Sequence, residues 1–147
     1  MDKIGEIKAA FLALLKVALP NHYELSNAYT IEGNPNVALQ QGFGVSVGAG
    51  NRENFDVSTK GYSRQFNVVL IRVIGGTELD TAGRQATEGQ ILSDFKAVCD
   101  TIWASPTLGL EAVDTDYESD SGIDFMAADG QKYYATNITF NVRYREM

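Results

Sequence analysis

Cysteine and histidine are almost missing from this sequence of 147 residues. Cys99 is the single cysteine, which excludes an internal disulfide and any metal cluster built from several cysteines. His22 is the single histidine, so histidine-rich zinc sites are excluded and catalysis by a Ser–His or Cys–His pair has one candidate base. Neither residue has a partner evident in the sequence. We interpret His22 as a helix-capping or surface residue and Cys99 as a core residue.

Long apolar runs are also missing. The early run Ala9–Leu15 covers seven residues before Lys16 interrupts it, whereas a membrane-spanning helix needs about 20. Asp2 and Glu6 stand where a secretory signal would carry a basic leader. We therefore expect no membrane association and synthesis in the cytoplasm.

Basic residues are outnumbered. The 12 lysines and arginines stand against 19 acids, for a net charge of -7, and a dedicated nucleic-acid binder shows the opposite balance because it must neutralise phosphates. The excess is local, since Ala97–Gln131 contains eight acids and no lysine or arginine. The remaining 11 acids and 12 bases nearly cancel. The chain is predicted to be a near-neutral body with one strongly negative segment.

The length and the 44% hydrophobic content suit one folded domain, residues 1–147. Apolar residues at helical spacing predict a helix from Lys3 to Leu19, ended by Pro20-Asn21. Short strands are predicted at Ala28–Glu32 and around Phe43–Val47. Glycines and polar residues predict that Gly48–Asn54 is a flexible loop.

The middle of the chain predicts one strong strand and a second helix. Gln65–Ile74 is read as a central strand with both faces covered, because Val68–Ile71 is apolar without alternation. Thr87 is interpreted as the N-cap of the following helix in a capping box with Gln90, although the helical pattern could start near Asp80. Ser105-Pro106 closes the helix. Its predicted apolar stripe is Leu92, Phe95, Val98, Cys99 and Ile102.

The last third predicts strands at Glu111–Asp120, Ile123–Ala127 and Tyr133–Arg145, with a hairpin turn at Asp129-Gly130. The order of elements predicts an α+β fold: a single domain with a mixed, mostly antiparallel sheet packed by two helices. The final strand carries residue types that are enriched both in interfaces and in strand cores, and the two interpretations stay open. These residues are Tyr133, Tyr134, Arg143, Tyr144 and Arg145.

No motif predicts catalysis, a cofactor or a metal. Asp114-x-Asp116-x-Glu118 resembles the start of a calcium loop, but Ser119 and Phe125 stand where that loop needs glycine and glutamate. A strand with one acidic, solvated face is the better interpretation. Gly48-x-Gly50 does not open a helix, so it lacks the context of a phosphate-binding loop. We expect a protein that acts through its surfaces and not as an enzyme.

Taken together, several segments resemble those of the tail terminator (tail completion) proteins of long-tailed bacteriophages. They are the amphipathic opening helix Ile4–Leu19, the glycine-rich Gly48–Asn54, the strand Phe66–Ile74 leading through Gly75-Gly76 into the helix ending at Ile102-Trp103, and the closing hairpin Ile123–Arg145. The final strand carries the strongest resemblance. The similarity covers the whole chain as a pattern and has no short diagnostic motif.

The resemblance implies a structural virion protein without a cofactor, which forms a homohexameric ring on the head-proximal end of the tail tube. Such a ring stops tube growth and presents a docking surface for the head. Its expected partners are further copies of itself, the tail tube protein and a head–tail connector or neck protein. DNA is expected to pass through the ring without specific binding.

Three groups of site residues follow as hypotheses. The acids Asp114, Asp116, Glu118 and Asp120 are expected on one strand face, either as a channel wall that repels DNA or as an outer solubilising surface. The loop residues Asn34, Asn36, Asn51, Arg52, Glu53 and Asn54 are either partner contacts or ordinary hairpin tips. The candidate subunit interface is Tyr133, Arg143 and Arg145.

Two other functions remain open at this point. A head–tail connector or neck protein has a similar size and α+β build. A small-ligand-binding α+β domain or an enzyme would instead form a monomer or dimer with a closed apolar pocket that contains convergent polar groups.

Overall fold

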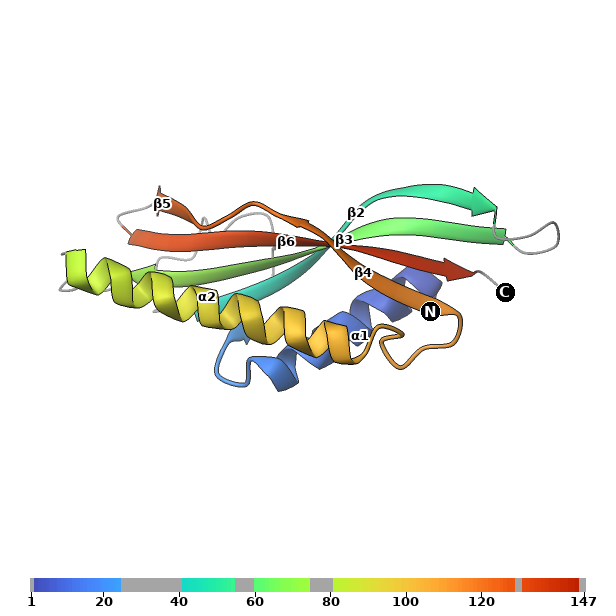
Figure 1. The fold of residues 1–147 in the computed structure, drawn as a ribbon, viewed down its shortest axis with the longest axis horizontal. Helices are drawn as coiled ribbons and strands as arrows, with labels where there is room; N and C mark the ends of the chain where they lie inside the picture. The colour runs from blue at the N-terminus through green and yellow to red at the C-terminus, as the bar shows by residue number, and fades with distance from the viewer. Residues whose placement is uncertain (1, 25–40, 55–59, 75–80, 129–130, 146–147) are drawn as a thin grey trace.

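The structure is a computed structural model of the 147-residue chain and describes residues 2–24, 41–54, 60–74, 81–128 and 131–145. Within these ranges the chain forms two helices and a six-stranded sheet (Figure 1). The elements in order are α1 (Lys3–Ala18), β1 (Tyr23–Glu24), β2 (Gln41–Asn54), β3 (Lys60–Ile74), α2 (Thr81–Ala104), β4 (Val113–Asp120), β5 (Asp124–Ala128) and β6 (Gln131–Arg145).

The sheet is mixed and mostly antiparallel, which confirms the predicted fold class. Its strand order is β1-β2-β3-β6-β4, and β5 pairs with the other end of β6. The short β1 is parallel to β2, and every other pairing is antiparallel. The long strands β3 and β6 form the centre, and their register runs from Gly61 opposite Arg145 to Ile74 opposite Lys132.

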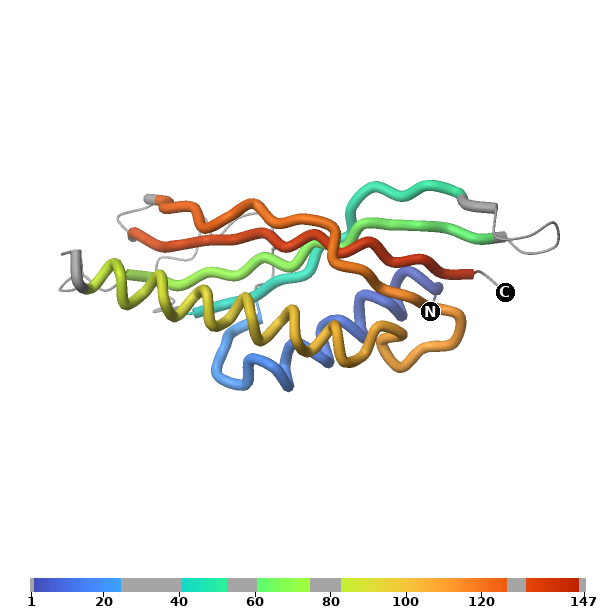
Figure 2. Tube along the Cα trace, viewed as in Figure 1, coloured from blue at the N-terminus to red at the C-terminus, as the bar shows by residue number. Residues whose placement is uncertain are grey.

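Both helices lie on one face of this sheet, so the domain has two layers (Figures 1 and 2). The Phe11 ring of α1 stacks on Phe66 of β3 with ring centroids 5.4 Å apart, and it lies 5.7 Å from Phe140 of β6. All three rings are buried. Burial of a large aromatic side chain removes 150–250 Å² or so from water. This contact therefore anchors α1 across the two central strands.

Helix α1 forms where the sequence predicts it. The Asp2 carboxylate accepts a hydrogen bond from the Gly5 N–H at 2.7 Å and so caps the first turn. Ile7, Phe11 and Leu15 recur at helical spacing and are fully buried. The helix ends at Ala18, before the predicted stop at Pro20-Asn21.

The prediction of a flexible loop at Gly48–Asn54 is wrong. These residues continue β2 and pair with β3, from Gly50 opposite Arg64 to Asn54 opposite Lys60, after an irregular register between Val47 and Gly50. Small side chains hid the strand, because Gly48, Ala49 and Gly50 carry no apolar–polar alternation. A Cβ on Gly48 would lie 3.0 Å from the Gln65 Cβ, so the close approach of the strands favours glycine.

Strand β3 begins at Lys60, five residues before the predicted Gln65 start. Val68 and Leu70 are fully buried beneath the helices. On the opposite face Ile71 is also buried, whereas Val69 is half-buried. The expectation that both faces are covered therefore holds for Ile71, although both helices lie on the other side.

Helix α2 begins earlier than the capping box indicated. Thr87 is not an N-cap: it lies inside Thr81–Ala104, and its hydroxyl donates to the Gly83 carbonyl at 3.0 Å. Packing of this helix on β3 and β6 overrides the low helix propensity of its glycines. The buried stripe contains Ile91 in place of the predicted Leu92, which is 49% exposed. The helix ends at Ala104, before Ser105-Pro106 as predicted.

The C-terminal strands agree with the sequence. β4, β5 and β6 correspond to the three predicted segments. On β6 the residues Thr136, Ile138, Phe140, Val142 and Tyr144 are buried beneath the helices, and the other face is mostly half-buried. The predicted strand Ala28–Glu32 and turn Asp129-Gly130 lie outside the described residues. Neither described helix is both long enough and apolar enough to cross a membrane.

Phe11→Ala should lower the free energy of unfolding by about 3–5 kcal/mol, because it empties a site that Phe66 and Phe140 enclose. Val17, 78% exposed on the same helix, is the matched control, and Val17→Ala should change stability by less than about 0.5 kcal/mol. Urea denaturation followed by circular dichroism measures both. Equal losses in the two variants would contradict the anchoring role of Phe11.

Candidate functional site

Three of the four predicted acids share one face of the edge strand β4. Asp114 and Asp116 are paired in register with Arg143 and Asn141 of β6, on the face away from the helices. The Arg143 guanidinium lies 2.7 Å from the Asp114 carboxylate and 3.5 Å from that of Asp116. Glu118 accepts a hydrogen bond from the Gln65 amide at 2.8 Å. We call Asp114, Asp116 and Glu118 the acidic row.

Asp120 does not belong to this row, contrary to the prediction. A register irregularity between Tyr117 and Ser119 shifts the strand, and Asp120 lies opposite Ile138, whose side chain faces the helices. The Tyr117 hydroxyl donates to the Asp120 carboxylate, and the Gly122 N–H donates to it at 2.8 Å. These bonds lower the pKa of Asp120 and raise the pKa of Tyr117 to about 12. The prediction placed Asp120 in the row because it assumed that side chains alternate regularly along the whole of β4.

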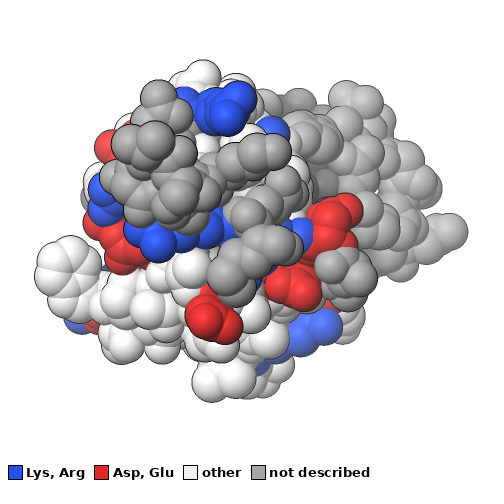
Figure 3. Space-filling model, turned by 90° about the vertical axis from the view of Figure 1, so that its right-hand side faces the viewer, with Lys and Arg blue, Asp and Glu red and all other residues white. Residues whose placement is uncertain are grey.

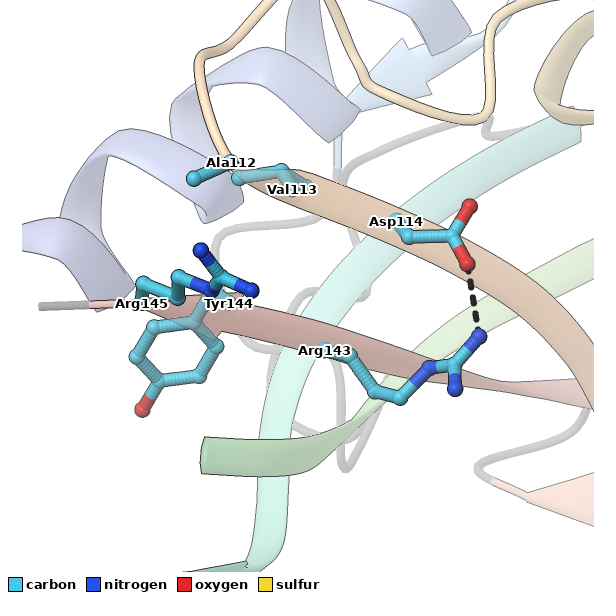
Figure 4. A pocket seen from close by; sticks show the side chains of 6 residues that line it. All are labelled: Ala112, Val113, Asp114, Arg143, Tyr144 and Arg145. Atoms are coloured by element: carbon cyan, nitrogen blue, oxygen red, sulfur yellow. Dashed lines mark hydrogen bonds and ion pairs between the residues drawn. The ribbon is translucent and has the colours of Figure 1, made fainter. Parts of the chain in front are cut away.

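A pocket of about 330 Å³ lies beside the acidic row, where β4 begins and β6 ends (Figure 4). Two residues of the predicted subunit interface, Arg143 and Arg145, line it together with Asp114. Arg143 points toward Asp114 in this view. Tyr133, the third predicted interface residue, lies near the other end of β6 and is 7% exposed. The structure therefore unites two of the three residues and separates the third.

This end of the molecule carries charges of both signs. Figure 3 looks onto it and shows acidic and basic side chains next to one another. The predicted contact residues Asn51, Arg52, Glu53 and Asn54 are strand residues of β2 and not a loop. Asn51 and Arg52 are exposed. Asn34 and Asn36 lie outside the described residues.

A buried charged cluster was missed by sequence reasoning. The Arg72 guanidinium of β3 binds both carboxylate oxygens of Asp94 on α2, at 2.7 and 2.9 Å, and donates to the Gln41 side-chain oxygen at 2.7 Å. His22 Nε2 lies 3.1 Å from the same carboxylate. The His22 side chain is 4% exposed, so the surface interpretation of this residue is wrong. The cluster joins four segments: the end of α1, β2, β3 and α2.

The sequence contained a signal for this cluster. Arg72 interrupts an apolar strand at a position that faces the helices, and Asp94 stands between Ile91 and Val98 at helical spacing. Two opposite charges at buried positions of neighbouring elements must pair, because an isolated buried charge is strongly disfavoured. The predicted stripe began at Leu92 and not at Ile91, so Asp94, three residues after Ile91, was left off the buried face.

The cluster holds its carboxylate in the charged form. Burial alone would raise the pKa of Asp94, but the contacts with His22 and Arg72 outweigh burial and lower the pKa below its ordinary value. A carboxylate with a lowered pKa is a weak base at neutral pH, so it suits a structural ion pair better than proton transfer. Burial and the neighbouring Asp100 and Asp120 raise the pKa of Cys99 to about 11, so its thiol stays protonated.

Within the described ranges, no group of three or more potential metal-ligating side chains comes together. The carboxylates that resembled a calcium loop instead contact Arg143 and Gln65. Cys99 is half-buried and packs against the hydrophobic core, as predicted.

Comparison with known proteins identifies the fold. No family model and no curated protein matches the chain. Among solved structures, the chain is similar to one described as "Virion of native gene transfer agent (GTA) particle", with a TM-score of 0.52 and 13% sequence identity. The similarity covers 95% of this chain and 94% of that chain. The fold is therefore shared, almost end to end, with a chain of a gene transfer agent virion.

Asp94→Asn should destabilise the fold at pH 7 by about 3–5 kcal/mol, because it leaves the buried Arg72 charge without a counter-charge. In the wild type, the stabilisation by the Asp94 carboxylate is fully present above the pKa of an unfolded aspartate, about 3.9. It is lost as the pH falls through the lower pKa that Asp94 has in the folded state. Asp100, an exposed acid on the same helix, provides the control Asp100→Asn. Unfolding curves from pH 7 to pH 2 should show a weaker acid dependence in Asp94→Asn alone; identical pH profiles would refute the coupling.

Proposed function

We propose that this chain is a structural component of a tailed phage or phage-like virion, and that it is the terminator of the tail tube. In this role it forms a homohexameric ring at the head-proximal neck, ends tube growth and presents the surface on which the head docks. The observation that carries the proposal is the fold shared with a gene transfer agent virion chain over 95% of this chain. The sequence pattern of the tail terminators supports the same role.

The sheet edges supply a means of closing a ring. β4 lies at one edge and, within the described residues, hydrogen-bonds only to β6. At the other edge β1 covers only the start of β2, and the described part of β2 from Gly44 to Asn54 pairs only with β3. Among the described residues, the backbone groups on these two edges have no strand partner, an arrangement that suits head-to-tail association of identical copies. Repetition of such a contact by a constant rotation closes a ring.

The acidic row is the proposed lining of the channel through which DNA passes. It lies on the sheet face that the helices leave uncovered, where Asp114 and Asp116 are paired with Arg143 and Glu118 accepts from the uncharged Gln65 amide. A net negative wall repels phosphates, so DNA slides without adhering. If the acidic row lies on the outside of the ring, it forms a solubilising surface instead.

Addition of the purified chain to polymerising tail tube protein from the same genome should stop growth, because a ring seated on the tube end lacks the surface that adds the next subunit. Electron microscopy should show short tubes with one ring-bearing end, and tube length should fall as the chain-to-tube ratio rises. Unlimited growth with no chain bound at the ends would refute the terminator role. Binding only to portal-side proteins would favour the neck connector.

Asp114→Lys combined with Asp116→Lys should slow DNA ejection from assembled particles, since two lysines beside Arg143 convert the acidic row into a basic one. The charge-matched control is Glu88→Lys with Glu111→Lys, at two exposed positions outside β4. Ejection rates measured by release of a DNA-binding dye should fall for the first variant only, with greater slowing at low salt. Equal rates in both variants would exclude a channel position for the acidic row.

A further inference from the structure

The edge strand β4 is open to solvent along most of its length. Val113 and Thr115 are buried, but every residue from Asp116 to Asp120 is exposed. Within the described residues β4 pairs with β6 alone, so the backbone groups on its outer side have no strand partner there. An exposed strand edge is a template for a further strand, and the same edge of a second copy is always present in solution.

Symmetry decides which residues would meet if two β4 edges paired. Two identical strands that pair antiparallel are related by a two-fold axis perpendicular to the sheet. This axis keeps each face on its own side, so the uncovered face of one copy continues into the uncovered face of the other. Residues that stand opposite one another in a sheet share a face. Side chains on the uncovered face of β4 can therefore meet only side chains from the same face of the second β4.

Up to Glu118, all the side chains on the uncovered face of β4 are acids. They are the acidic row, Asp114, Asp116 and Glu118. If the axis passes beside Asp116, this residue meets its own copy and Asp114 meets Glu118. If the axis passes beside Tyr117, Asp116 meets Glu118 twice. Neighbouring registers also pair two members of the row. Every register along this part of the strand thus sets like charges opposite one another, which destabilises the pairing.

The nearest base offsets only part of this charge. The Arg143 guanidinium contacts Asp114 at 2.7 Å and Asp116 at 3.5 Å, and it belongs to β6, on the inner side of β4. Glu118 contacts an uncharged amide. Three carboxylates and one guanidinium leave a net charge of -2. The carboxylates would stand between the two arginines in a self-paired edge, so they would meet first.

The other bases near this edge lie beyond the row. Arg145 is opposite the chain that precedes β4, where its N–H donates to the Ala112 carbonyl at 3.3 Å. Lys3 donates to the Glu111 carbonyl at 2.9 Å from α1, on the helix-bearing side. Between Ala97 and Gln131 the sequence contains no lysine or arginine. The segment that carries the row therefore supplies no base of its own to offset its charge.

A second feature of β4 also opposes edge-to-edge pairing. The register irregularity between Tyr117 and Ser119 interrupts the strand and turns Asp120 toward the helix-bearing face. Irregularities of this kind and charged side chains are two means by which sheet edges avoid pairing with other edges. Because only Val113–Tyr117 is regular, a self-paired β4 would form few backbone hydrogen bonds to set against the repulsion.

The opposite sheet edge lacks this charge. From Gly44 to Asn54 the outer strand β2 contains one arginine and one glutamate, so its net charge is zero. Pairing of β4 with the β2 of another copy therefore brings no row of like charges together. The two edges differ as head-to-tail association requires, because a contact between two β4 edges is opposed and one between unlike edges is not.

We propose that the acidic row prevents β4 from pairing with the β4 of a second copy and so keeps this edge free for a different strand. The effect belongs to the free chain in solution and does not require the terminator role. If the chain forms a ring, the effect has a further consequence, because dimers joined through β4 would withhold that edge from the ring.

The test neutralises the row and keeps its closest ion pair. Asp116→Asn combined with Glu118→Gln retains Asp114 beside its arginine and brings the net charge of the group to zero. Glu88→Gln combined with Asp100→Asn removes the same charge from two exposed positions of α2 and is the control. Circular dichroism should be unchanged in both variants, because all four side chains are exposed.

Sedimentation velocity of the chain alone, over a range of concentrations, measures the association. In about 0.01 M salt the neutralised variant should dimerise at least about tenfold more tightly than the wild type or the control. In about 1 M salt the difference should shrink, because the Debye length falls to about 3 Å. Hydrogen exchange should show the β4 amides protected in the dimer, which locates the contact.

A mixing experiment tests the pairing of charges directly. A variant that combines Asp114→Lys, Asp116→Lys and Glu118→Lys should not pair with itself through β4, because positive charges then stand opposite one another. An equimolar mixture of this variant with the wild type should form heterodimers through β4, since each lysine then meets an acid. Added salt should weaken these heterodimers.

Several results would overturn the inference. The neutralised variant could associate no more tightly than the control in low salt, or the wild type could already pair through β4 there. Dimers whose β4 amides stay unprotected would place the contact elsewhere and reject the inference as well. Because the chain is tested alone, a failure to stop the growth of tail tubes would reject the terminator role and leave this inference standing.

Discussion

The contact of Phe11 with Phe66 and Phe140 is the interaction on which the rest of the architecture depends. It fixes α1 across the two central strands and, with α2 alongside, commits both helices to one face of the sheet. The described part of the opposite face carries the acidic row on β4 and the buried Ile71 and Tyr133 on β3 and β6. The strand edges lie at the two sides. A domain built this way has its main hydrophobic core on the helix-bearing side of the sheet.

The Arg72–Asp94 pair fixes the orientation of α2, which the apolar core leaves underdetermined. Hydrophobic contacts are not directional, whereas a bidentate guanidinium–carboxylate pair requires one geometry. The same carboxylate contacts His22 directly after α1, so one acid connects both helices to the sheet. This ion pair helps to set the position of α2 relative to β4 and β5.

The edge strand β4 shows how a local irregularity changes a surface. With regular alternation, four acids would face one side. The register shift after Tyr117 turns Asp120 toward the helices, where it contacts the Tyr117 hydroxyl. The acidic row that remains is shorter and is partly neutralised by Arg143. The extent of the proposed channel surface therefore depends on this shift.

The sequence by itself determined the elements whose periodicity is strong and the class of fold that they build. α1, the core of β3 and the two faces of β6 follow from apolar spacing, because each buries one side against the same core. The α+β class follows from their order. The position of the acidic segment could also be read directly from the chain.

Tertiary structure alone decided the features that depend on contacts between distant residues. Gly48–Asn54 became a strand because β3 supplied hydrogen-bond partners, and α2 began at Thr81 because packing outweighed its glycines. The ion pair of Asp94 with Arg72 joins residues 22 positions apart, and that of Asp114 with Arg143 joins residues 29 positions apart. The Arg84 guanidinium meets the Phe125 ring only once α2 lies beside β5. Local spacing cannot encode such pairings, since they arise from the mutual placement of elements after folding.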